Sequence, residues 1–94
     1  MKEKTLRDQG CKTLTDIAKE LAGQGVIPIR DVFPMVKTLA DITKNGEFKR
    51  TYVSRHTLYP PESIYQILNK LKGKNELDHR KLDKLIEKYE RMIK

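Results

Sequence analysis

The amino-acid sequence predicts a mainly α-helical domain that carries one small β-hairpin. Two observations support this fold class. Apolar residues recur at helical spacing in several segments, which glycine and proline residues separate. One segment, 47–59, is instead rich in the β-branched and aromatic residues that favour strands. The chain has 94 residues, the length of a single domain, so we expect one thin hydrophobic core.

The chain starts with a polar segment, 1–12, in which Leu6 is the main apolar residue. We expect a short helix or a flexible arm there. Its cations (Lys2, Lys4 and Arg7) are of a type that contacts phosphate, although a frayed terminus is the simpler expectation.

The first long helix is predicted over residues 13–22. Thr13 and Asp16 have the spacing of a capping box at its start, and Gly23 and Gly25 end it. One face of this helix is apolar, with Leu14, Ile17, Ala18, Leu21 and Ala22 at helical spacing.

The segment 26–29 favours β-structure but contains a proline, so it predicts an edge strand or a tight connection. A second helix is predicted over 31–44, with Asp31 as its N-cap and Pro34 in its first turn. Alternatively, Pro34 itself opens the helix and 30–33 form a separate short turn. The buried face is formed by Val32, Met35, Val36, Leu39 and Ile42, and Asn45 and Gly46 end the helix.

The β-rich segment is long enough for two short strands, although Ser54, Arg55 and His56 make a poor tight turn at its middle. A third helix is expected over 61–72, after two prolines.

Asp78 caps the last predicted helix, 78–94. Its apolar stripe has nearly the 3.5-residue spacing of a helix-pairing seam, with Leu82, Leu85, Ile86, Tyr89, Met92 and Ile93. The stripe either packs on the body of the domain or forms a dimer interface. We favour the dimer, because the rest of the helix is heavily charged and the stripe reaches the last turn.

The net positive charge of the chain indicates which class of molecule it binds. The chain has 20 lysines and arginines against 13 acidic residues, a net charge of +7, and a pI near 9.6. Such a basic domain attracts polyanions, of which nucleic acid is the commonest. Cys11, the single cysteine, excludes an internal disulfide and a cysteine zinc site, and fits a reducing cytoplasmic compartment. No membrane span or secretory signal is expected, and no metal or other cofactor.

The order of a helix, a short strand, a further helix and a basic β-rich stretch makes residues 13–59 resemble a winged helix-turn-helix domain. With the pairing helix at 78–94, the chain is similar to small dimeric regulators of the PadR type and to the partition adaptors that coat archaeal plasmid centromeres. The resemblance implies a winged-helix domain at 13–77 and a homodimer on double-stranded DNA. For the partition proteins, it also implies spreading along DNA, a second protein partner and a location on the nucleoid or plasmid. Repressor and partition roles both stay open.

Under this interpretation, helix 31–44 enters the major groove, and the hairpin follows the phosphate backbone. Lys37 and Thr38 are then expected near bases and Lys44 near phosphate. Asp41 either accepts from cytosine or serves to reject other sequences. The full set of predicted DNA-binding residues is Arg30, Lys37, Thr38, Lys44, Lys49, Arg50, Tyr52, Arg55 and His56. The alternative recognition helix is 61–72, which would leave little room for a wing before Asp78.

Other functional classes have less support. A protein-interaction adaptor would dock its basic surface or last helix on an acidic partner; Lys70, Lys72 and Lys74 form one cluster for such a contact or for flanking phosphates. RNA binding usually relies on an aromatic platform, and the aromatic residues are scattered. An enzyme is not expected, because His56 and His79 lack partners at catalytic or metal-binding spacing.

Overall fold

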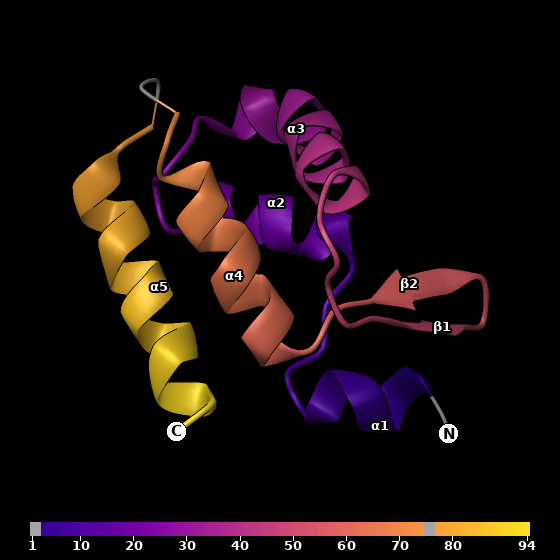
Figure 1. Ribbon diagram of the computed structural model, residues 1–94. Coiled ribbons are helices and arrows are strands. Elements are labelled where there is room, and N and C mark those ends of the chain that lie inside the picture. The colour runs from indigo at the N-terminus through magenta and orange to yellow at the C-terminus, as the bar shows by residue number, and fades with distance from the viewer. Residues whose placement is uncertain (1–2, 75–76) are drawn as a thin grey trace.

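A computed structural model describes residues 3–74 and 77–94 of the chain (Figure 1). Helices dominate, and a two-stranded antiparallel hairpin interrupts them, as the sequence predicts. The elements in chain order are α1 (Glu3–Asp8), α2 (Leu14–Gly23), the 3₁₀ turn η1 (Ile29–Asp31), α3 (Val32–Lys44), β1 (Thr51–Val53), β2 (His56–Leu58), α4 (Pro61–Leu71) and α5 (His79–Met92).

Local signals fix both ends of α2. The Thr13 side chain accepts a hydrogen bond from the backbone N–H of Asp16, and the Asp16 carboxylate accepts from the N–H of Thr13, which confirms the capping box. At the other end, Gly25 has a φ of +80°. The N–H groups of Gly25 and Val26 donate back to the carbonyls of Ala22 and Leu21, the pattern of a Schellman motif.

Residues 26–29 form a tight connection from α2 into η1, so of the two alternatives that the sequence left open the edge strand is excluded. Val26 and Ile27 are buried in the core as irregular chain, and Pro28 leads into η1. The carbonyl of Val26 accepts a hydrogen bond from the N–H of Asp78 (3.2 Å), which ties this connection to the start of α5. Val26 and Ile27 are apolar because their side chains pack into the core, and not because the segment belongs to a sheet.

The β-strand prediction for 47–59 is confirmed over 51–58, where β1 and β2 pair in register Thr51↔Leu58 and Val53↔His56. The next residue, Tyr59, exchanges two backbone hydrogen bonds with Lys12. Successive residues of a strand direct their backbone groups to opposite edges. The segment at Lys12 therefore adds a short third pairing on the edge of β2 that lies away from β1.

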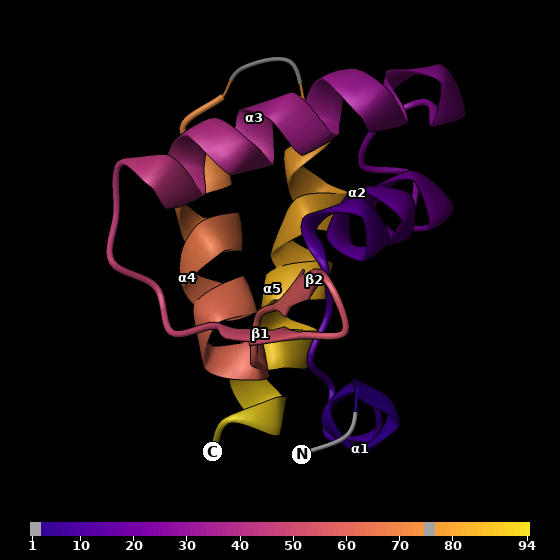
Figure 2. The same cartoon turned by 90° about the vertical axis from the view of Figure 1, so that its right-hand side faces the viewer.

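The main core lies between α2, α3, α4 and α5, and α4 is central to it. α2 packs on α3, α3 on α4, and α4 on α5 (Figures 1 and 2). A second, smaller cluster joins α1 to the hairpin and consists of Leu6, Cys11 and Leu58, with Val53 against it. The hairpin thus projects from a rigid helical body and is supported from below by α1 (Figure 1).

The apolar stripe of α5 packs inside the chain. Leu82, Leu85, Ile86 and Tyr89 are all buried in the main core. The predicted dimer interface is corrected for these four residues, because they are already covered by the body of the same chain. Met92 and Ile93 are the members of the stripe that stay exposed, at 46% and 41%.

Candidate nucleic-acid interface

The hairpin carries four exposed side chains of the types that contact nucleic acid. Arg50 immediately precedes β1, Tyr52 lies on β1, Arg55 lies at the tip, and His56 begins β2. Tyr52 is 72% exposed although it is a large aromatic residue. Within residues 3–74 and 77–94, neither arginine forms an ion pair, so both guanidinium groups are available to an anionic partner.

The tip of the hairpin holds two non-glycine residues in the left-handed region. Ser54 has a φ of 51° and Arg55 a φ of 68°, and they form a two-residue loop between paired Val53 and His56. Two consecutive positive φ values are the geometry of a type I′ turn, which usually has Asn-Gly or a similar pair. Neither Ser54 nor Arg55 is of that kind, so the residue types alone did not indicate a tight turn at this position. This turn places the exposed Arg55 at the tip of the hairpin.

The base of the hairpin is anchored to α4. The fully buried Ser63 hydroxyl donates to the carbonyl of Lys49 at 2.7 Å. The Lys49 ammonium lies 3.3 Å from the Glu62 carboxylate, and both side chains are largely exposed. Lys49 therefore differs from the other predicted phosphate contacts, because its charge already has a partner within the chain.

The outer face of α3 carries a second group of exposed residues. Lys37 and Lys44 lie on it, with Asp41 beside them, as predicted. Phe33 and Ala40 share this face, and Phe33 is 82% exposed. Sequence reasoning missed Phe33, although its position outside the buried periodicity of the helix was a usable signal. Arg30, another of the predicted residues, is exposed on η1, next to Ile29, which is 81% exposed.

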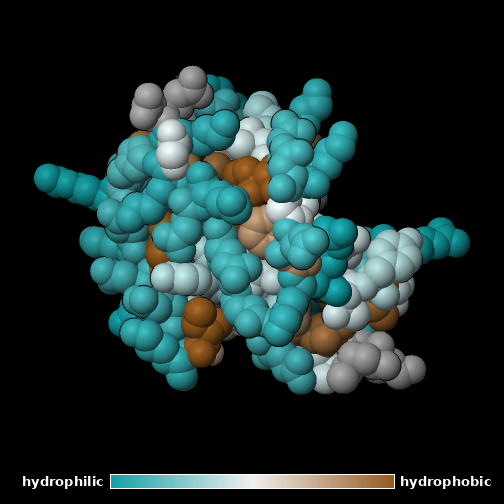
Figure 3. All heavy atoms as spheres, viewed as in Figure 1, coloured by the Kyte–Doolittle hydropathy of each residue, from teal (hydrophilic) through white to brown (hydrophobic). Residues whose placement is uncertain are grey.

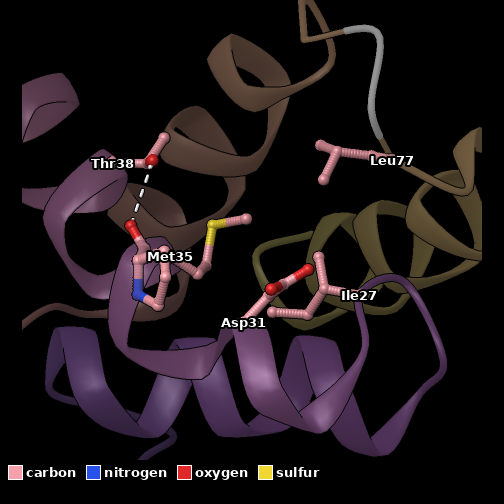
Figure 4. A pocket seen from close by; sticks show the side chains of 6 residues that line it. Ile27, Asp31, Met35, Thr38 and Leu77 are labelled. Atoms are coloured by element: carbon pink, nitrogen blue, oxygen red, sulfur yellow. Dashed lines mark hydrogen bonds between the residues drawn. The ribbon is translucent and has the colours of Figure 1, made fainter.

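Thr38 lies elsewhere. It is half-buried, its hydroxyl donates to the carbonyl of Pro34 at 3.2 Å, and it lines a hollow of about 200 Å³ (Figure 4). Ile27, Met35 and Leu77 give this hollow apolar walls, and Asp31 lies at its edge. The expectation that Thr38 shares a solvent face with Lys37 is corrected, since consecutive helical residues are about 100° apart.

The alternative recognition helix, 61–72, corresponds to α4. One side of it is fully buried, with Ser63, Ile64, Ile67, Leu68 and Leu71 at 0% exposure. α4 packs against both α3 and α5, so two of its sides are occupied by neighbouring helices. In the neighbouring lysine cluster, Lys72 is paired with Asp83 of α5 at 2.9 Å.

A part-buried ionic cluster links α2 to the Lys12 segment and to α5. The Glu20 carboxylate accepts hydrogen bonds from Lys12 (2.8 Å), Lys88 (2.6 Å) and the Tyr89 hydroxyl, and its side chain is only 12% exposed. Burial by itself raises the pKa of Glu20, but these three donors outweigh it, so the pKa lies below its ordinary value. The same burial and the adjacent carboxylate raise the pKa of Tyr89, which stays protonated and donates.

The face of the molecule seen in Figure 3 is largely hydrophilic. Hydrophobic residues appear on the face seen in Figure 3 only as small separate patches, and the hairpin stands out at the right below α3.

Among the described residues, no group of three metal-ligating side chains is gathered together, and no helix there has the length and apolar character needed to cross a bilayer. Cys11 is buried against Leu6 and Leu58, which raises the pKa of its thiol.

Comparison of the chain with models of protein families, with curated proteins and with solved structures gives no match.

Proposed function

We propose that this protein binds double-stranded DNA, with the hairpin on the phosphate backbone and the outer face of α3 toward the bases. The observation that carries the proposal is the hairpin itself. It places Arg50, Tyr52, Arg55 and His56 on one exposed projection, and neither arginine is paired within the described chain. Arginine, tyrosine and histidine are residue types that hydrogen-bond phosphates, and the chain has a net charge of +7.

The order of elements supports a winged-helix interpretation. It runs from α1 through the short pairing at Lys12 to α2 and α3, and then to β1 and β2, so the short strand lies before α2 and not at 26–29, where the sequence predicts it. A winged helix has this order of helices and strands, with the first short strand beside the last. In this interpretation α3, which directly precedes the hairpin, is the recognition helix.

We further propose that the protein acts as a homodimer on a repeated or palindromic site, as a repressor or a plasmid centromere-binding protein. The exposed pair Met92 and Ile93 is the part of the predicted interface that a second chain can reach without opening the core. These residues line a shallow groove with Gln9, Pro60 and Pro61. Two half-sites in the bound sequence would support the dimer. The position of the site, at a promoter or at a plasmid centromere, distinguishes the repressor from the centromere-binding protein.

The test starts with selection of bound duplexes from a random DNA pool at near-physiological salt. Binding of the selected duplex is then measured against salt concentration for the wild type and for the double variant Arg50→Ala/Arg55→Ala. Each phosphate contact contributes a slope of about 0.9 in log affinity against log salt concentration. We therefore expect the double variant to lose about 1.8 from the slope and to bind all duplexes more weakly.

The matched control is Lys81→Ala/Lys84→Ala, which removes the same charge from two exposed lysines of α5, a helix that the proposed DNA surface does not use. We expect its slope to stay near that of the wild type. Equal slope losses in both double variants would show a general charge effect and contradict the hairpin assignment. Recovery of no duplex above background would contradict DNA recognition as such.

A further inference from the structure

The outer face of α3 has an apolar component that phosphate binding does not use. Phe33 is 82% exposed, and Ile29, one turn earlier on η1, is 81% exposed. Ala40 lies seven residues after Phe33, two turns along the same face, and is exposed as well. Two large, exposed apolar side chains four residues apart give this end of the face the apolar character of a surface that contacts a partner.

The residues between them indicate the class of partner. Lys37 follows Phe33 by one turn, and Lys44 follows Ala40 by one turn, so basic and apolar side chains alternate along the face. The core of a protein–protein interface is depleted of lysine, which disfavours a second protein here. The major groove of DNA offers both partners at once, phosphates along its rims and the 5-methyl group of thymine on its floor.

The charged residues of α3 are also consistent with DNA as the partner. Neither Lys37 nor Lys44 forms an ion pair in the described part of the chain. The single acidic residue of α3, Asp41, lies beside them, and a carboxylate can accept from the exocyclic amine of cytosine. Phenylalanine and alanine are both residue types that contact the thymine methyl group.

We infer that Phe33 and Ala40 are specificity-determining residues that contact thymine methyl groups in the major groove. This inference rests on the proposed DNA binding and on α3 as the recognition helix. Seven residues of α-helix span about 10 Å, which is about three base pairs at about 3.4 Å each. The selected site therefore contains thymines, on either strand, separated by about three base pairs.

The experiment replaces each thymine of the selected duplex, one at a time, with deoxyuridine. This change removes the 5-methyl group and keeps every hydrogen-bonding group. Wild-type affinity falls by about fourfold where the methyl group is buried. In Phe33→Ala the affinity for the thymine duplex falls, and thymine and uracil become equivalent at one of these positions.

Two control variants accompany it. Met92→Ala also removes an exposed apolar side chain, at the end of α5 where the proposed dimer forms; it changes the affinity for both duplexes by the same factor and keeps the full preference for thymine. Tyr52→Ala weakens binding of both duplexes by the same factor, because it acts from the hairpin. Phe33 is exposed, so its replacement leaves the core intact, and an unchanged thermal unfolding midpoint verifies this.

The outcomes separate the inference from the function on which it rests. If the protein selects a site but binds the thymine and uracil duplexes equally at every position, the inference is overturned and DNA binding stands. A thymine preference that persists in Phe33→Ala also overturns the assignment. So does a Phe33→Ala protein that keeps its DNA affinity but changes its sedimentation, since the face would then be a protein interface.

Discussion

Removing the Glu20 carboxylate tests how the helical body is held together behind the proposed interface. Glu20 joins α2 to the Lys12 segment and to α5 through Lys12, Lys88 and Tyr89. In Glu20→Ala, the hydroxyl of fully buried Tyr89 loses its acceptor, which costs about 1–3 kcal/mol. The two lysines are partly exposed and regain water, so each lost ion pair adds less than about 1 kcal/mol.

We therefore expect Glu20→Ala to lower the free energy of unfolding by about 2–3 kcal/mol, a large share of the roughly 5–15 kcal/mol typical of a domain. The corresponding loss in unfolding temperature is about 10–20 °C for a chain of this size. Urea unfolding at pH 7 measures the change, with an unchanged dependence on denaturant as the sign that two-state unfolding is kept.

Two further variants sharpen the result. Glu20→Gln keeps an acceptor for Tyr89 and removes only the charge, so it is expected to cost about 1 kcal/mol. Glu90→Ala breaks an exposed contact with Lys94 at 3.9 Å and is expected to cost less than about 0.5 kcal/mol. A loss for Glu20→Ala no larger than that of Glu90→Ala would refute the reasoning that this cluster is a principal tie between α2 and α5.

Three other predictions concern the pH dependence of stability, the hairpin tip and the packing of α5. The pKa of Glu20 is depressed in the folded protein, so its contribution to stability is complete above the ordinary pKa of 4.5 and is lost as pH falls below it; unfolding of Glu20→Gln should depend less on pH in that window. Arg55→Gly removes the cost of a left-handed φ at the hairpin tip. We expect the free energy of unfolding in urea to rise by about 1 kcal/mol and DNA binding to weaken. Weaker binding with an unchanged free energy of unfolding would show that the tip is not strained. Leu85→Glu places a charge in the core and should unfold the domain. Ile93→Glu should leave the domain folded and, if the proposed dimer uses this surface, produce monomers in sedimentation. A folded monomeric Leu85→Glu protein would contradict the packing of α5.

The elements of this fold that local chemistry specifies were predictable from the sequence. Thr13 with Asp16, Pro61 and Asp78 all stand at the first turns of helices, where side chains or a missing N–H meet unpaired backbone groups. Apolar spacing identified the buried faces of α2 and α3, and β-branched residues identified the hairpin. The net charge, and with it the expectation of an anionic partner, was also a property of the sequence alone.

What lay beyond the sequence depended on contacts between distant segments. The apolar stripe of α5 has the same pattern whether it faces a second chain or the body of its own, and only packing against α4 decides between the two. Phe33 and Met35 are equally apolar in sequence, yet one is exposed and the other buried, because α3 can bury only one side. The pairing of Lys12 with Tyr59 and the gathering of Lys12 and Lys88 on Glu20 join residues far apart in the chain, and such contacts leave no local pattern.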